Sequence, residues 1–203
     1  MRWSHIALLA GAGLVVGATL AGFTAMVGGQ NPQQTRSASI SVADIGGPFT
    51  LTDTGGEPFT EKNLIGRPAA IFFGFTFCPD ICPTTLYELT GLMRELGPQA
   101  DAIDFVFVSV DWERDGPQQV SRYLQAFDRR MIGLSGTQAQ VEAAAGAFKI
   151  HVQRVPLEDG GYTMDHTASV LLMGPDGRFT GTLDYDEPRE TKLEKLRRLA
   201  GAE

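Results

Sequence analysis

Two unbroken apolar runs constrain the fold of this chain more than any other feature of its sequence. Residues 69–77 read AAIFFGFTF and residues 104–111 read DFVFVSVD. Runs of this kind, rich in aromatic and β-branched residues, are typical of strands that are buried on both faces of a sheet. Between them, LYELTGLMREL has the apolar spacing of an amphipathic helix, which Gly97-Pro98 ends. The sequence therefore predicts a strand–helix–strand unit.

The same alternation continues along the chain and then changes. PQQVSRYLQAF predicts a second helix, MIGLSG a short strand, and TQAQVEAAAGAF a third helix. Further on, KIHVQRV, HTASVLLM and RFTGTL are typical of strands joined by the turns EDGG and GPDG, and EPRETKLEKLRRLA predicts a closing helix. We therefore expect an α/β protein with a thioredoxin-like fold, with an added N-terminal β-hairpin around GGPFTLTDTGG and a β-hairpin insertion.

Length and charge narrow the possible partners. With 203 residues, the chain is long enough for one domain with a packed core. It carries 17 Lys and Arg against 24 Asp and Glu. Because a protein that binds phosphate backbones needs a basic surface, we expect no nucleic-acid partner.

The N-terminal segment predicts a membrane anchor. Residues 6–27 contain no charged residue, and a helix of that length spans the ~30 Å hydrocarbon core of a bilayer. Arg2 precedes the segment and no basic residue follows it before Arg36, so residues 1–5 are expected in the cytoplasm. In a bacterium this predicts a single-pass inner-membrane protein whose C-terminal part is periplasmic.

The alternative for the same segment is a cleaved signal peptide, although the apolar region of a signal peptide usually runs only ~7–15 residues. No cysteine lies near the end of the segment, which excludes lipoprotein processing. Residues 28–40, rich in Gly, Gln and Ser, predict a flexible tether. The folded, exported domain is then expected over residues 41–203.

The only two cysteines, Cys78 and Cys82, follow the first buried run directly. Pro83 is tolerated only in the first turn of a helix, so the helix must begin between Pro79 and Cys82, with Asp80 as a plausible N-cap. Cys82 then lies in the first turn and Cys78 in the preceding loop. The positive end of the helix macrodipole favours thiolates there.

This position predicts a functional site, because open α/β proteins bind ligands at the carboxyl edge of the sheet. A structural disulfide is the alternative, but a bridge across so small a loop stabilises a protein little. Two thiolates also form half of a soft-metal site. Of the three histidines, His5 is expected across the membrane, and His151 alternates with its neighbours as an ordinary strand residue does. His166, at a predicted loop–strand boundary, is the remaining candidate ligand.

Three segments in this order resemble the signatures of the Sco/SenC family of membrane-anchored copper-binding proteins: FCPDICP, SVDWERD and DHTASVLLMGPDGRF. The resemblance covers roughly residues 45–200. It implies that Cys78, Cys82 and His166 bind copper, as Cu(I), Cu(II) or both. It also implies that the protein helps to assemble the binuclear copper centre of cytochrome c oxidase, with oxidase subunit II as copper acceptor and other periplasmic copper chaperones as partners.

The charged residues near this site have two interpretations each. Asp111, Glu113 and Asp115, with Arg114, follow the second buried run and are expected to surface near the same edge. They form either a loop that docks a partner or shapes the site, or an ordinary acidic loop that caps the next helix.

Asp80 and Asp165 flank the predicted ligands. Each is a candidate hydrogen-bond acceptor for His166, as groups around a metal site often are.

Several functions remain open at this stage. A metallochaperone needs all three ligands, whereas a thiol-disulfide reductase that maintains the cysteines of the oxidase copper site needs only Cys78 and Cys82. A redox or copper sensor would use the same three residues. A peroxidase of the peroxiredoxin kind is disfavoured, because Ile71 and Phe75 stand where that family has a proline and a threonine. Whether the chain is an enzyme is thus undecided by its sequence.

Overall fold

The structure is a computed structural model that describes residues 45–158 and 160–201. Its main sheet has seven strands in the order β2-β1-β5-β4-β3-β8-β9, and β6 pairs with β7 in a separate sheet. The strands are β1 Thr50–Asp53, β2 Pro58–Thr60, β3 Ala69–Gly74, β4 Asp104–Ser109, β5 Ile132–Ser135, β6 Val152–Pro156, β7 Tyr162–His166, β8 Val170–Met173 and β9 Phe179–Leu183. The helices are η2 Glu61–Leu64, α2 Ile81–Leu96, η3 Gly97–Ala102, α3 Pro117–Leu124, α4 Gln138–Phe148 and α5 Arg189–Leu199.

The centre of the sheet is the parallel trio β5-β4-β3. All six residues of β3 are buried, as the apolar run predicts. Antiparallel strands complete the sheet on both sides, with β8 and β9 next to β3 and with β1 and β2 next to β5. The predicted mixed α/β sheet is confirmed.

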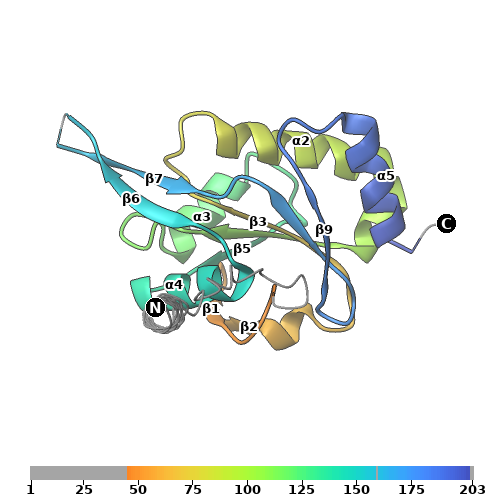
Figure 1. Cartoon of the computed structure of the whole chain (residues 1–203), viewed down its shortest axis with the longest axis horizontal. Coiled ribbons are helices and arrows are strands. Elements are labelled where there is room, and N and C mark those ends of the chain that lie inside the picture. Colours follow the sequence, from red (N-terminus) through yellow and green to blue (C-terminus); the bar gives the residue numbers. More distant parts are fainter. Residues whose placement is uncertain (1–44, 159, 202–203) are drawn as a thin grey trace, which may run out of the picture. The chain divides into compact units, whose positions relative to one another are not determined.

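Helices cover both faces of this sheet (Figure 1). Successive residues of a strand point to opposite faces, so Phe72 packs near Phe107 while Phe73 packs near Phe148 of α4. On the face opposite α4, α2 and α5 lie together, and buried Lys192 of α5 donates a 2.7 Å hydrogen bond to Glu88 of α2.

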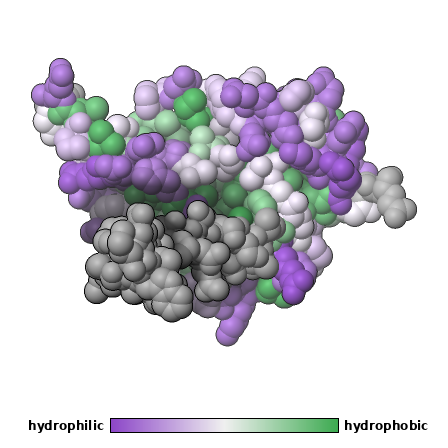
Figure 2. Space-filling model, in the orientation of Figure 1, coloured by the Kyte–Doolittle hydropathy of each residue, from purple (hydrophilic) through white to green (hydrophobic). Residues whose placement is uncertain are grey.

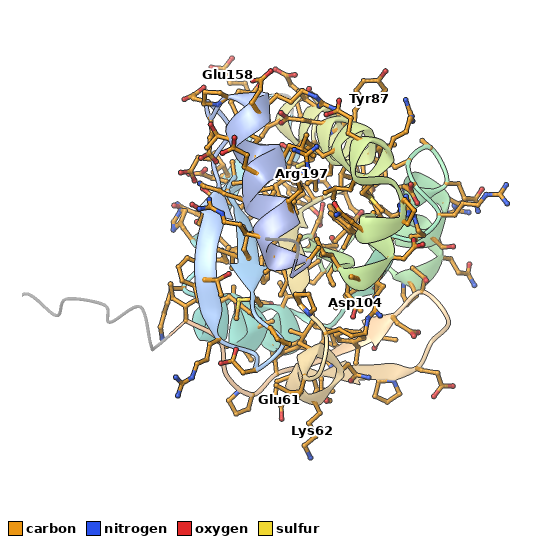
Figure 3. The ribbon with its side chains drawn as sticks, turned by 90° about the vertical axis from the view of Figure 1, so that its right-hand side faces the viewer. Glu61, Lys62, Tyr87, Asp104, Glu158 and Arg197 are labelled. Carbon is orange, nitrogen blue, oxygen red and sulfur yellow. The ribbon has the colours of Figure 1, made fainter. Side chains whose placement is uncertain are left out.

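The outer surface of the helical layer is polar. The surface over α5 is mainly hydrophilic (Figure 2), which is expected of a helix that buries only one side. In Figure 3, Tyr87 of α2 lies at one side of the domain, and Glu61 and Lys62 of η2 lie at the other.

The predicted N-terminal hairpin is present but is placed differently. Its second strand, β2, begins at Pro58, beyond the predicted segment, and β1 also pairs with β5. The hairpin thus extends the main sheet.

The predicted strand HTASVLLM is wrong at its start. Residues 162–166 form β7 and pair with β6, with Val152 opposite His166, and β8 begins only at Val170. The polar composition of YTMDH concealed this strand, because a two-stranded sheet open to solvent needs no apolar run.

None of the helices within the described ranges is long and apolar enough to cross a membrane. The predicted anchor at 6–27 and the predicted tether at 28–40 lie outside the described residues. Both stay predictions.

Helix α3 approaches β5 closely at one glycine. A Cβ atom at Gly133 would lie 2.6 Å from a methyl carbon of Val120 and 2.7 Å from one of Leu124, both on α3. Real Cβ atoms do not approach so closely, so α3 can reach the sheet only because residue 133 has no side chain. This contact sets the position of the helix that follows the Asp111–Asp115 loop.

We expect Gly133→Ala to lower the free energy of unfolding by about 1–3 kcal/mol, because the new methyl group must push α3 away from β5. Gly146→Ala on α4 is the matched control, since nothing lies within 4 Å of a Cβ there. In a helix the control substitution should leave stability unchanged or raise it by roughly 0.5–1 kcal/mol. Urea unfolding of both variants measures the difference, and equal stability of the two would contradict the packing argument.

Candidate metal centre

The two cysteines lie where the first strand of the parallel trio meets its helix. Strand β3 ends at Gly74 and α2 begins at Ile81, so Cys78 lies in the connecting loop and Cys82 in the first helical turn, as predicted. Asp80 occupies the N-cap position, but its side chain makes no capping bond to the helix backbone. Its carboxylate instead accepts a 3.2 Å hydrogen bond from the hydroxyl of Thr84.

The two sulfur atoms have unequal environments. Both cysteines are free thiols, Cys78 partly exposed and Cys82 buried. The backbone N–H of Cys82 donates to Sγ of Cys78 at 3.4 Å. A Cβ at Gly74 would lie 3.1 Å from Sγ of Cys82 and 2.9 Å from the ring of Phe107. Glycine at position 74 therefore leaves the space that the buried sulfur occupies.

His166 reaches this pair from the other end of the sequence. Its Nε2 lies 3.5 Å from Sγ of Cys82, across 84 residues. Its Nδ1 lies 2.9 Å from the carbonyl oxygen of Thr167. Because a carbonyl oxygen only accepts, Nδ1 carries the proton and Nε2 turns its lone pair toward the sulfur. This is the tautomer that a metal-binding imidazole needs.

Two aromatic rings hold the imidazole in place. The ring of Phe72 meets His166 at a centroid distance of 6.2 Å and an angle of 70°, and that of Phe75 at 5.8 Å and 89°. Edge contacts of this kind favour one orientation of a ring over others. The orientation of Nε2 toward Cys82 is thus built into the core.

The pair has one acidic and one weakly acidic thiol. A hydrogen bond from the side chain of Cys82, together with the backbone amides of Cys82 and Asp80, lowers the pKa of Cys78 to about 4, and partial burial opposes that shift. The pKa of Cys82 is raised far above its ordinary value, because its thiol donates to Cys78 and is buried. Without metal, the pair therefore shares one proton, which Cys82 holds.

The donor set fits a soft metal ion. With metal–ligand bonds of ~2.0–2.3 Å, two ligands in a three-coordinate site lie about 3.7 Å apart, close to the 3.5 Å between Cys82 and His166. Within residues 45–158 and 160–201, no group of three or more His, Cys, Asp or Glu side chains is spaced so that it could hold a metal ion as it stands. A bound ion would thus replace the shared proton and draw the three ligands around itself.

The predicted surface position of two acidic residues is wrong. Asp111 and Asp115 are each only 1% exposed. The capping interpretation is also wrong, because α3 begins after Gly116 without a side-chain cap. Only Glu113 is at the surface, where it pairs with Arg154 at 3.4 Å.

Asp115 instead holds the cysteine loop. Its carboxylate accepts hydrogen bonds from the backbone N–H and the hydroxyl of Thr76, both at 2.7 Å, and from the hydroxyl of Ser109 at 2.6 Å. Burial raises the pKa of this carboxyl, and the hydrogen bonds oppose that shift. The loop that carries Cys78 is therefore tied to the end of β4, which supports the site-shaping interpretation.

The other predicted neighbours of His166 do not contact it. Its ring nitrogens face Thr167 and Cys82, whereas Asp165 lies 3.7 Å from the imidazole of His151 in an exposed position. The expectation that Asp80 or Asp165 orients His166 is wrong, because a backbone carbonyl does so. His151 lies outside the cysteine cluster, as expected.

Sequence reasoning missed Thr76, Ser109 and Tyr162. Thr76 and Ser109 are the first polar residues at the ends of the two apolar runs, which was a usable signal. Tyr162 donates a 2.8 Å hydrogen bond to Asp111, although it lies in a polar segment without a motif.

Comparison with known proteins agrees with this geometry. The sequence model of the SCO1/SenC family matches residues 37–201. The chain belongs to the SCO1/SenC family. A structure of Bradyrhizobium japonicum ScoI with copper bound is 44% identical, with a TM-score of 0.71, over 76% of this chain and 99% of that one. Yeast Sco1 with copper bound is 32% identical, with a TM-score of 0.73, over 79% and 90%.

A mouse mitochondrial SCO1 homolog is 35% identical over 80% of this chain. The match spans 57% of the mouse protein, so the two chains share the family domain and not their whole length. The thioredoxin-like α/β fold of the Sco family is thus confirmed for the described domain.

We expect the two thiols to differ in reactivity. In the reduced, metal-free protein, iodoacetamide should modify Cys78 at a nearly constant rate from pH 6 to pH 8, because a thiol with a pKa of about 4 is already a thiolate over that range. An ordinary thiol gains roughly tenfold per pH unit below its pKa of ~8.5. Mass spectrometry after limited alkylation should find Cys82 unmodified.

The matched control is Cys82→Ala, which removes the donor that most lowers the pKa of Cys78. In this variant the rate should rise with pH as for an ordinary thiol. A steep pH dependence in the unaltered protein would contradict the assignment.

Proposed function

We propose that this protein is a copper metallochaperone that binds copper through Cys78, Cys82 and His166. The observation that carries the proposal is the 3.5 Å approach of His166 Nε2 to Cys82 Sγ, with Sγ of Cys78 beside the amide of Cys82. Two sulfur ligands and one imidazole suit Cu(I) by their softness, and a further oxygen or solvent ligand lets the same set hold Cu(II). Copper-bound relatives support this assignment.

Unequal burial of the ligands suits a carrier. Cys78 is partly exposed and Cys82 is fully enclosed. An incoming ligand of an acceptor can therefore approach copper on the side of Cys78, while Cys82 and His166 still hold the ion. Stepwise ligand exchange of this kind releases copper without passing it through water.

The same proposal includes the partners and the location. BsSco, a structural relative of this chain, is a member of the Sco family of cytochrome c oxidase assembly proteins. We infer that subunit II of the oxidase receives the copper and that other periplasmic copper chaperones supply it. The uncharged segment 6–27 would anchor the protein in the inner membrane, with residues 41–203 in the periplasm.

One observation favours a second function, that of a thiol-disulfide reductase. The lowered pKa and partial exposure of Cys78 are properties of an attacking thiol. Its thiolate would attack a disulfide of the oxidase copper site and form a mixed disulfide. Cys82 would then displace the second partner thiol, so that the partner gains two electrons and this protein ends with a Cys78–Cys82 disulfide.

Replacement of His166 separates the two functions. We expect His166→Ala to lose tight copper binding, measured as copper per purified protein after competition with a chelator, because two thiolates alone leave the site one ligand short. Oxidase activity in cells that carry only this variant should fall with it. His151→Ala is the matched control, since that imidazole is exposed and lies outside the cluster.

Retention of full oxidase assembly by His166→Ala, combined with its loss in Cys78→Ser and Cys82→Ser, would overturn the chaperone proposal in favour of the reductase. Equal copper binding by His166→Ala and the unaltered protein would overturn the assignment of the third ligand.

A further inference from the structure

Near the cysteine loop, two arginines and two aromatic residues form a stack. The guanidinium of Arg114 lies 3.8 Å from the ring centroid of Tyr162 and 4.7 Å from that of Phe77. The guanidinium of Arg154 lies 4.0 Å from the same Tyr162 ring. Two guanidinium groups cannot share one ring face at these distances, so they lie on opposite faces. We call Phe77, Arg114, Tyr162 and Arg154 the arginine–aromatic stack.

The stack joins the segments that carry the predicted ligands. Phe77 precedes Cys78 in the loop, and Tyr162 is the first residue of β7, whose last residue is His166. Arg114 lies between them, in the loop after β4. The stack therefore connects the cysteine loop to the strand that ends in the histidine.

Hydrogen bonds fix Arg114 within the stack. Its Nη1 donates to the backbone carbonyl of Tyr162 at 3.2 Å, and its Nε donates to the carboxylate of Asp111. The hydroxyl of Tyr162 donates to the same carboxylate at 2.8 Å. Arg114 Nη2 is buried and has no hydrogen-bond acceptor among the described residues, so the ring faces are what stabilises that side of the cation.

Apart from the stack, the β6–β7 ribbon is attached to the rest of the domain through buried Met164, the ring contacts of His166 and the exposed Arg154–Glu113 ion pair. Its strands pair with each other and not with the main sheet, and the ribbon extends from the body of the domain (Figure 1). Within β7 only Met164 is buried. The base of the ribbon is closed by hydrogen bonds between His151 and Thr167, which join the two strands to each other and not to the cysteines.

We propose that Arg114 is a positioning residue of the copper site, which holds the ribbon so that His166 meets Cys82. The inference rests on the proposed function, and it adds a residue that does not touch copper. The planar guanidinium of Arg114 lies close to the rings of both Tyr162 and Phe77, a contact that lysine cannot reproduce.

The test compares copper binding by purified variants of the chain. Arg114→Ala should bind copper about 10- to 100-fold more weakly, the usual cost of removing a group that orients a metal ligand. Its Cu(II) absorption and electron paramagnetic resonance spectra should shift toward those of His166→Ala, because the imidazole is lost from a fraction of the molecules. Thermal unfolding of each variant verifies that it is folded.

Two variants of Tyr162 keep the test decisive if Arg114→Ala does not fold. Tyr162→Leu should reproduce the weaker binding and the spectral shift, whereas Tyr162→Phe, which keeps the ring and loses only the hydrogen bond to Asp111, should bind copper more tightly than Tyr162→Leu. Arg178→Ala is the matched control, since this arginine is 86% exposed in the β8–β9 turn.

A double variant shows whether Arg114 acts through His166. In the His166→Ala background, Arg114→Ala should cause no further loss of affinity, because there is no imidazole left to position. A full, additive loss in that background would overturn the proposal, as would an unchanged affinity and spectrum in Arg114→Ala alone. Failure of the unaltered protein to bind copper would overturn the proposed function itself, which is a separate and recognisable outcome.

Discussion

Burial of the parallel strands β3 and β4 is the constraint on which the site depends. Both strands run through the core and must end at the same edge of the sheet, since they are parallel and in register from Ala69 with Asp104 to Gly74 with Ser109. The loops that follow them are therefore neighbours. One loop carries both cysteines, and the other carries the Asp111–Asp115 segment.

Two buried carboxylates fix the arrangement of these neighbouring loops. Removing Asp115 from water is unfavourable, and three hydrogen bonds from Thr76 and Ser109 offset that cost. The same cost of burial for Asp111 is offset by the cation of Arg114 and by the hydroxyl of Tyr162. Asp115 thus ties the cysteine loop to the end of β4, and Asp111 ties the ribbon to the loop after β4.

The asymmetry of the two thiols follows from the start of α2. Cys82 is enclosed by α2 and the strands below it, whereas Cys78 precedes the helix, remains partly exposed and accepts hydrogen bonds from the helix start. One sulfur is thereby an accessible thiolate and the other a protected donor. Both transfer of a soft ion and attack on a disulfide can use this asymmetry, so the cysteine pair alone does not decide between the two functions.

The sequence by itself determined the features that depend on neighbouring residues. Apolar runs predicted β3 and β4, and Pro83 placed the start of α2. That start put Cys78 in the loop before the helix and Cys82 in its first turn. Only the tertiary structure decided the rest: that the carbonyl of Thr167 and no carboxylate orients His166, that Asp111 and Asp115 are buried, and that YTMDH is a strand. The two buried carboxylates are held by partners up to 51 positions away, Tyr162 for Asp111 and Thr76 for Asp115, and His166 faces a cysteine 84 positions away. No local pattern specifies these partners.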